Sequence, residues 1–298
     1  MSTSRSPLVV VGVDGSPGSG HAVDWAAAEA HRRGDRLELL YAEVPTPPVV
    51  GLEPAPVAPL SRDAVPFFLE EARQRVAVAW PDLGIELGPT VGSPASSLIE
   101  RSAHADLVVV GAHGRSMISR LFLGSVSHHV ATHARCTAVV VRGEPRSASA
   151  PVAVGVDDSP TSSHALEVAF GEAAMRGVPL VVFHAWQDLP ATGYGVWAPP
   201  PDLTAEFRHE AETLVADTLL GWPDKFPDVE VHTRIEHSHP VTAVVAESEL
   251  AQLVVLGAHG RGHFAGMDVG SVPSAAVREA QCPVMVVRPE PGRQADRQ

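Results

Sequence analysis

The chain has 298 residues, of which 45% are apolar and 19% charged, a composition typical of globular proteins with room for two domains. Its formal charge of -13 argues against non-specific binding to nucleic acid or to an anionic membrane. No apolar run approaches the roughly eighteen residues of a membrane span. Residues 8–13 are too few for the apolar core of a signal peptide, so we expect a cytoplasmic protein.

The first half alternates between strand and helix patterns. A strand at 8–13 leads to a helix at 19–33 closed by Gly34, and a second strand follows at 37–44. Six prolines within residues 45–59 predict a surface loop. A helix is then expected from near Ser61 to about Trp80, followed by an edge strand at 85–91 that Gly88 and Pro89 interrupt. A helix after Pro94, a buried strand at 107–110, a helix from Ser125 and a strand at 137–142 complete this half.

The second half repeats the first. Segment 11–17 returns as 154–160, segment 107–115 returns as 253–261, and residues 143–151 have the composition of a linker. Strands are predicted at 151–156, 178–185, near 228–235, 252–257 and 283–288, with helices at 162–176 and near 203–221. His237 and His239, which precede Pro240, are predicted to lie in a loop.

This order predicts an α/β fold with two domains, residues 1–146 and 147–298. Each domain should be an open parallel five-stranded sheet, Rossmann-like, with helices on both faces.

Small and acidic residues follow the first and fourth strands of each half. Asp14 and Asp157 follow the first strands, and two glycines, then a Gly-Ser pair, follow each fourth strand. Ligands of such sheets bind beyond the carboxyl ends of the strands, where the strand order reverses. Glycine at 111 and 114 would allow positive φ and the close approach of a phosphate. The helices that begin at Ser125 and Ser271 would add the N–H groups of their first turns and a dipole that favours an anion.

Several of these residues have a second interpretation. The aspartates precede Ser-Pro and could simply cap a helix. His113 and His259 could donate to a phosphate or satisfy the loop backbone. The loops are not P-loops, because neither matches GxxxxGK[ST] and Lys225 is the only lysine. His129 and His133 have the spacing of metal ligands, but no carboxylate partner is evident, so we interpret them as surface or interface histidines.

Asp after the first strand and G-x2-G-x9-G-S after the fourth, in both halves, resemble the universal stress protein family. The tandem arrangement is similar to actinobacterial two-domain members of its ATP-binding branch. The resemblance implies a sheet order of 3-2-1-4-5 and ATP, with or without Mg²⁺, in each half. The implied nucleotide-binding residues are Gly12, Asp14, Ala42, Gly111, His113, Gly114, Arg115, Gly124, Ser125 and Val126, and then Gly155, Asp157, Ala185, Gly257, His259, Gly260, Arg261, Gly270, Ser271 and Val272.

The resemblance also implies a homodimer with a regulatory role in stress or dormancy and an unknown protein partner. The net charge and the short apolar runs predict no binding to nucleic acid or membrane. Two alternatives stay open: a slow Mg²⁺-dependent ATPase or phosphotransferase, and an interaction protein with vestigial pockets. We expect the first half to hold a triphosphate more tightly. Its glycine loop carries Arg115 and Arg120, whereas the second carries Arg261 and Asp268 and is followed by Pro273, which lacks an N–H.

Overall fold

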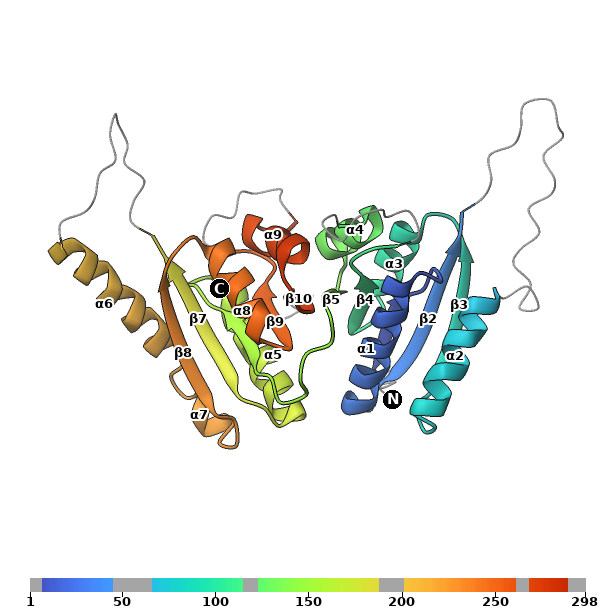
Figure 1. Ribbon diagram of the computed structural model, residues 1–298, viewed down its shortest axis with the longest axis horizontal. Helices are drawn as coiled ribbons and strands as arrows, with labels where there is room; N and C mark the ends of the chain where they lie inside the picture. Colours follow the sequence, from blue (N-terminus) through green and yellow to red (C-terminus); the bar gives the residue numbers. More distant parts are fainter. Residues whose placement is uncertain (1–6, 45–65, 115–122, 188–200, 261–267, 289–298) are drawn as a thin grey trace, which may run out of the picture. The chain divides into compact units, whose positions relative to one another are not determined.

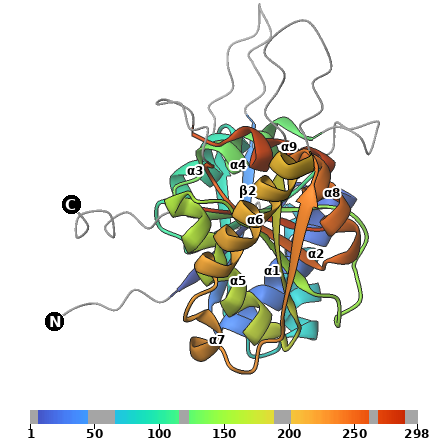
Figure 2. The same ribbon diagram turned by 90° about the vertical axis from the view of Figure 1, so that its left-hand side faces the viewer.

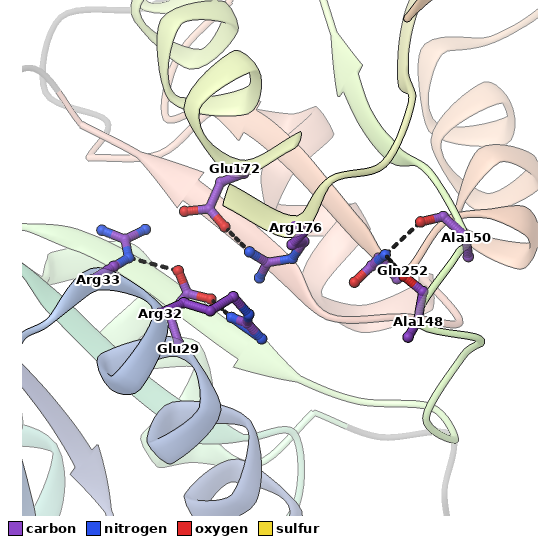
Figure 3. Close-up of polar contacts among 8 residues, drawn as sticks. All are labelled: Glu29, Arg32, Arg33, Ala148, Ala150, Glu172, Arg176 and Gln252. Carbon is purple, nitrogen blue, oxygen red and sulfur yellow. Dashed lines mark hydrogen bonds and ion pairs between the residues drawn. The ribbon is translucent and has the colours of Figure 1, made fainter. Parts of the chain in front are cut away.

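The computed structural model describes residues 7–44, 66–114, 123–187, 201–260 and 268–288 (Figure 1). The chain divides into two compact units, unit 1 (Met1–Arg142) and unit 2 (Gly143–Gln298). Unit 2 therefore begins at the first residue of the segment predicted as a linker. The side-chain amide of Gln252 donates to the carbonyls of Ala148 (3.1 Å) and Ala150, which holds this segment against unit 2 (Figure 3).

Unit 1 alternates strands and helices along the chain. Its elements are β1 (Leu8–Gly12), α1 (Pro17–Arg33), β2 (Arg36–Glu43), α2 (Phe67–Ala79), β3 (Ile85–Val91), α3 (Pro94–Ser102), β4 (Leu107–Gly111), α4 (Ser125–His133) and β5 (Thr137–Val141). The strands form a parallel sheet in the order β3-β2-β1-β4-β5. The predicted fold class, the order 3-2-1-4-5 and the edge position of residues 85–91 are confirmed.

Unit 2 repeats this arrangement with one extra short helix. Its elements are β6 (Val152–Gly155), α5 (Pro160–Arg176), β7 (Leu180–Trp186), α6 (Pro201–Thr218), α7 (Trp222–Lys225), β8 (Val231–His237), α8 (Pro240–Leu250), β9 (Leu253–Gly257), α9 (Ser271–Glu279) and β10 (Val284–Val287). Its parallel order is β8-β7-β6-β9-β10, which is again 3-2-1-4-5 within the unit.

The helices cover both faces of each sheet. On β2, Tyr41 packs edge-on against Phe68 of α2 (ring centroids 5.2 Å apart), while the Glu38 carboxylate pairs with Arg101 of α3 at 2.5 Å. Residues 38 and 41 point to opposite faces of a strand, so α2 and α3 lie on opposite faces of the sheet. In unit 2, α6 contacts β7 and β8, and Figure 2 views the unit from this side. With both faces covered, residues 9–11 and 107–109 of the central strands are fully buried.

The helix ends follow local sequence signals. Ser16 is the N-cap of α1, where its hydroxyl accepts the Ser19 N–H at 3.2 Å, and Gly34 ends the helix in the left-handed conformation (φ 70°). Ser159 and Gly177 (φ 63°) do the same for α5. Near its last turn each helix carries a buried carboxylate paired with an arginine four residues later, Glu29 in α1 and Glu172 in α5 (Figure 3).

Two sequence predictions need correction. The second helix begins at Phe67 and not near Ser61, because Pro66 is its N-cap and has no N–H to continue a helix towards the N-terminus. His237 is not in a loop, because it ends β8 and stacks on Trp186 at 4.2 Å. His239 does lie in the connection between β8 and α8, as predicted, and is the N-cap of α8. The loop predicted at 45–59 lies outside the described residues. Within the described part of the chain, every helix is too short or too polar to cross a membrane.

Candidate functional site

The candidate site lies at the carboxyl ends of two adjacent strands in each unit. In unit 1, β1 pairs with β4 from Val9↔Leu107 onward, and β4 ends at Gly111. In unit 2, β6 pairs with β9 from Val152↔Leu253, and β9 ends at Gly257. Each pair is where the strand order reverses, so the aspartate after one strand and the glycine loop after the other meet at one edge of the sheet.

Each aspartate uses one oxygen for its turn and turns the other towards the glycine loop. Asp14 Oδ1 accepts the Ser16 N–H at 2.9 Å, and Asp157 Oδ1 accepts the Ser159 N–H at 3.0 Å. Oδ2 lies 2.6 Å from the position a Cβ would take on Gly114 in unit 1, and 2.8 Å from the equivalent position on Gly260 in unit 2. Interpreting the aspartates as helix caps is wrong, because serines fill that role in both units.

The loop glycines are needed for close contacts and not for positive φ. None of Gly111, Gly114, Gly257 and Gly260 has a positive φ, so that part of the prediction is wrong. A Cβ on Gly111 would lie 2.5 Å from the Gly18 carbonyl oxygen, and one on Gly257 would lie 2.9 Å from the Thr161 carbonyl carbon. These glycines let the first turn of α1 or α5 pack against the strand end, and Gly114 and Gly260 leave room for the carboxylate.

The helices after the glycine loops begin without a side-chain cap. Gly124 and Gly270 are the N-caps of α4 and α9, and within the described residues no side chain caps either helix. The N–H groups of Ser125 and Val126, and those of Ser271 and Val272, therefore lie in a first turn, where the helix dipole favours an anion. The units differ at the next position. Ser127 donates its hydroxyl to the Gly111 carbonyl at 2.5 Å, whereas unit 2 has Pro273 there.

A cavity of about 590 Å³ joins these features in unit 2. It lies within the volume range of small-molecule sites, about 300–1,000 Å³. All the sequence-predicted residues of this half that the structure describes line it: Gly155, Asp157, Ala185, Gly257, His259, Gly260, Gly270, Ser271 and Val272. Arg261 lies outside the described residues, as does Arg115 of the first half.

Sequence reasoning missed the apolar wall of the cavity. Phe183 of β7, Leu256 of β9 and the helix residues Pro240 and Val244 also line it. A Cβ on Gly155 would lie 2.8 Å from Leu256 Cδ2 and 3.0 Å from Phe183 Cζ, so this glycine lets two large side chains meet beside the site. Phe183 lies two residues before Ala185 and Leu256 lies next to Gly257, so their positions in the sequence were a usable signal, but Pro240 and Val244 have no predicted site residue near them.

Unit 1 brings its predicted residues to the equivalent strand ends. Gly12 ends β1, Ala42 is the second-last residue of β2, and Gly124 donates its N–H to the Ala112 carbonyl at 2.8 Å. Leu98 of α3 approaches Gly12, with Cδ1 3.0 Å from the position of a Cβ. His113 follows β4, and its buried Nε2 has no hydrogen-bond partner among the described residues. This nitrogen therefore does not satisfy the loop backbone, which was one of the two interpretations of the histidine.

Other chemistry has little support in the described residues. Within them, no group of three or more His, Cys, Asp or Glu side chains is placed to hold a metal ion. His129 uses Nδ1 to contact the carbonyl of Ser125 at 2.7 Å, which is an ordinary contact within α4. The arrangement around the site is one of backbone N–H groups, one carboxylate and an apolar wall. Such a site can bind a ligand that has both a flat apolar part and an anionic part.

Comparisons of the sequence and comparisons of the structure with known proteins lead to the same family. The model of the universal stress protein family matches residues 8–142 and 150–288. A universal stress protein of Mycolicibacterium smegmatis is 39% identical, covering 94% of this chain and 97% of its own length. A universal stress protein of Mycobacterium tuberculosis strain H37Rv is 37% identical and covers 97% of each chain. The crystal structure of a universal stress protein from Archaeoglobus fulgidus has the same fold, with a TM-score of 0.60 at 21% identity over 95% of this chain and 99% of that chain.

Proposed function

Because this chain belongs to the universal stress protein family in both of its halves, we propose that it binds ATP, one molecule in each unit, and acts as a regulatory protein. The nucleotide would lie at the carboxyl ends of β1 and β4 in unit 1, and of β6 and β9 in unit 2. The strongest support is the cavity described in unit 2, because it gathers the carboxylate, the glycine loop and the helix start into one space.

Each part of the cavity suits one part of a nucleotide. Phe183, Val244 and Leu256 offer an apolar wall for a base, and the backbone of Ala185 at the end of β7 offers hydrogen-bonding groups to its edge. Asp157 can accept from ribose hydroxyls through the oxygen directed at the loop. The backbone of Gly260 and the first N–H groups of α9 can surround a phosphate without a lysine, as nests of N–H groups do elsewhere.

Unit 1 would use the equivalent residues. Asp14 takes the place of Asp157, the loop at Gly111 and Gly114 precedes α4, and His113 adds a ring nitrogen that has no other described partner. Arg115 and Arg261 follow the glycine loops in the sequence and would add positive charge near the phosphates. The proposal includes Mg²⁺ only as a companion of the triphosphate, which the phosphates themselves can hold.

A regulatory role in stress or dormancy and assembly as a homodimer belong to the same proposal. The proposal is of a binding protein, with slow or absent hydrolysis of the bound ATP. A protein of this kind would signal through its ATP-bound and empty states, each presenting different loops to a partner.

The proposal is tested by identifying what the purified full chain carries. The protein is denatured, and the released small molecules are separated and identified by mass spectrometry; a sample stripped of nucleotide is then titrated with ATP by calorimetry. We expect ATP in the released fraction and binding in the titration. Release of ADP alone would favour slow hydrolysis. An empty protein that also fails to bind added ATP would contradict the proposal.

A further inference from the structure

The two sites differ at matched positions in ways that bear on the charge of the ligand. We infer that the site of unit 2 holds a nucleoside monophosphate more tightly than a triphosphate, and that the site of unit 1 has the opposite preference. This inference rests on the proposed function and names the ligand class of each site. It depends on three features of the chain, namely the helix start, the acidic residue next to the site of unit 2 and the charge of each unit.

The first feature is the number of N–H groups at the helix start. In α4, residues 125–127 each carry an N–H in the first turn, and the first bond within this helix is from His128 N to the Gly124 carbonyl at 2.9 Å. In α9 the third of these positions is Pro273, which has no N–H. Pro273 also lines the cavity of unit 2. The site of unit 2 therefore lacks one backbone N–H donor that the helix start of unit 1 can offer to a polyphosphate.

The second feature is the charge beside the ligand. Among the described lining residues of the unit 2 cavity there is a carboxylate, that of Asp157, but no arginine or lysine. Asp158 follows it at the position that Gly15 occupies in unit 1, where the glycine has φ 79°. Unit 2 therefore places a second acidic residue next to the site where unit 1 has no side chain. The missing N–H at Pro273 and the added carboxylate of Asp158 both disfavour each additional negative charge on the ligand.

The third feature is the charge of the whole unit. Unit 1 carries 12 basic and 14 acidic side chains, whereas unit 2 carries 10 basic and 21 acidic ones, counting Lys, Arg, Asp and Glu over the full sequence. The net charges are therefore -2 and -11. ATP has two more phosphates than AMP and hence roughly two more negative charges, which the field of unit 2 opposes more strongly.

The nucleoside part of the ligand has no such conflict in unit 2. Its apolar wall includes Phe183 and Leu256, where unit 1 has the smaller Leu40 and Val110 at the equivalent strand positions. An aromatic ring and a larger aliphatic side chain give a base more contact area. Binding in unit 2 is thus expected to depend on the base, and binding in unit 1 on the phosphates.

The test measures each site separately in the full chain. Gly114→Ala places a methyl group against Asp14 and weakens the site of unit 1, and Gly260→Ala does the same to unit 2. Each variant is titrated with AMP and with ATP by calorimetry at fixed salt without added metal. In Gly114→Ala we expect AMP to bind about threefold to tenfold more tightly than ATP. In Gly260→Ala we expect ATP to bind more tightly than AMP.

The chain offers matched exchanges as controls. Adding Pro273→Ser to Gly114→Ala restores the N–H that unit 1 has at Ser127, and should shift the preference towards ATP by about tenfold, the effect of one charge-assisted hydrogen bond. Asp158→Gly, an exposed position, should shift it in the same direction by about threefold without disturbing the fold. Both shifts should be smaller in high salt, because screening weakens exposed charges.

The outcomes separate the inference from the proposed function. Tighter binding of ATP than of AMP in Gly114→Ala, with no effect of Pro273→Ser, would overturn the inference and leave nucleotide binding intact. A wild-type chain that binds neither nucleotide would overturn the proposed function itself. If a glycine variant does not fold, Asp158→Gly in the wild-type chain still decides the question, because an unchanged ratio of AMP to ATP affinity would contradict the inference.

Discussion

Replacing Gly260 by alanine tests the geometry of the site most sharply. The new Cβ would lie 2.8 Å from Asp157 Oδ2, whereas carbon–oxygen contacts normally lie at about 3.3–3.6 Å, so the carboxylate must move by at least about 0.5 Å. Its other oxygen is held by the N–H (3.0 Å) and the hydroxyl (2.5 Å) of Ser159. Hydrogen bonds to a charged group contribute about 1.5–3 kcal/mol, so turning the carboxylate is costly.

We expect Gly260→Ala to lower the ATP affinity of unit 2 at least about tenfold, or ~1.4 kcal/mol, and the stability of the unit by about 1–3 kcal/mol. The assays are calorimetric titration and urea unfolding. Gly171→Ala is the matched control, because Gly171 lies within α5 with no atom within 4 Å of its Cβ position. It should stabilise the protein by about 0.5–1 kcal/mol and leave binding unchanged. Wild-type affinity in Gly260→Ala would refute the reasoning.

Two further predictions concern unit 1. Burial, followed by the nearby Asp106 and Glu29 carboxylates, raises the pKa of Asp35 above its ordinary value of 3.8 despite the opposing Arg33. The folded protein therefore disfavours the ionised form, and Asp35→Asn should be more stable than wild type near neutral pH. This advantage, measured by unfolding across pH, should fade as the pH falls through the raised pKa towards 3.8; an advantage that grows in acid would contradict it. Arg101→Ala leaves the buried Glu38 carboxylate without its arginine and should cost about 1–3 kcal/mol in urea unfolding. Arg36→Ala, which breaks a half-exposed pair with Glu86, should cost less than about 1 kcal/mol, and equal costs would show that burial is not decisive.

The repeated sequence pattern was sufficient to predict most of the fold. Each buried strand that ends in glycine at 111 or 257 is a continuous apolar run, and the serine, proline and glycine signals around α1 and α5 mark helix ends in the sequence itself. The start of α2 was misplaced because Pro66, the N-cap of the helix, was not taken as a start signal. His237 was assigned to a loop because it closely precedes Pro240, whereas β8 continues through it.

The sequence predicted which residues form the candidate site, but it did not predict why those residue types are required there. Spacing identified Gly114 and Gly260, yet only the fold shows that each faces a carboxylate and has an ordinary φ. The apolar wall joins Phe183 of β7 to residues of α8 and β9 more than fifty positions later, so no single local pattern predicts the whole wall. The difference between Ser127 and Pro273 was visible in the sequence, but the bond from Ser127 to the Gly111 carbonyl was not.

The number of nucleotides bound per chain tests the central claim most directly. Native mass spectrometry of the stripped full chain counts bound molecules at an ATP concentration that fills the wild-type sites but not sites weakened about tenfold or more. The account predicts two ATP molecules per chain, one in Gly114→Ala or in Gly260→Ala, and none when both substitutions are combined. No bound ATP in the wild-type chain, or two ATP molecules on the double variant, would contradict the claim that these two loops hold nucleotide.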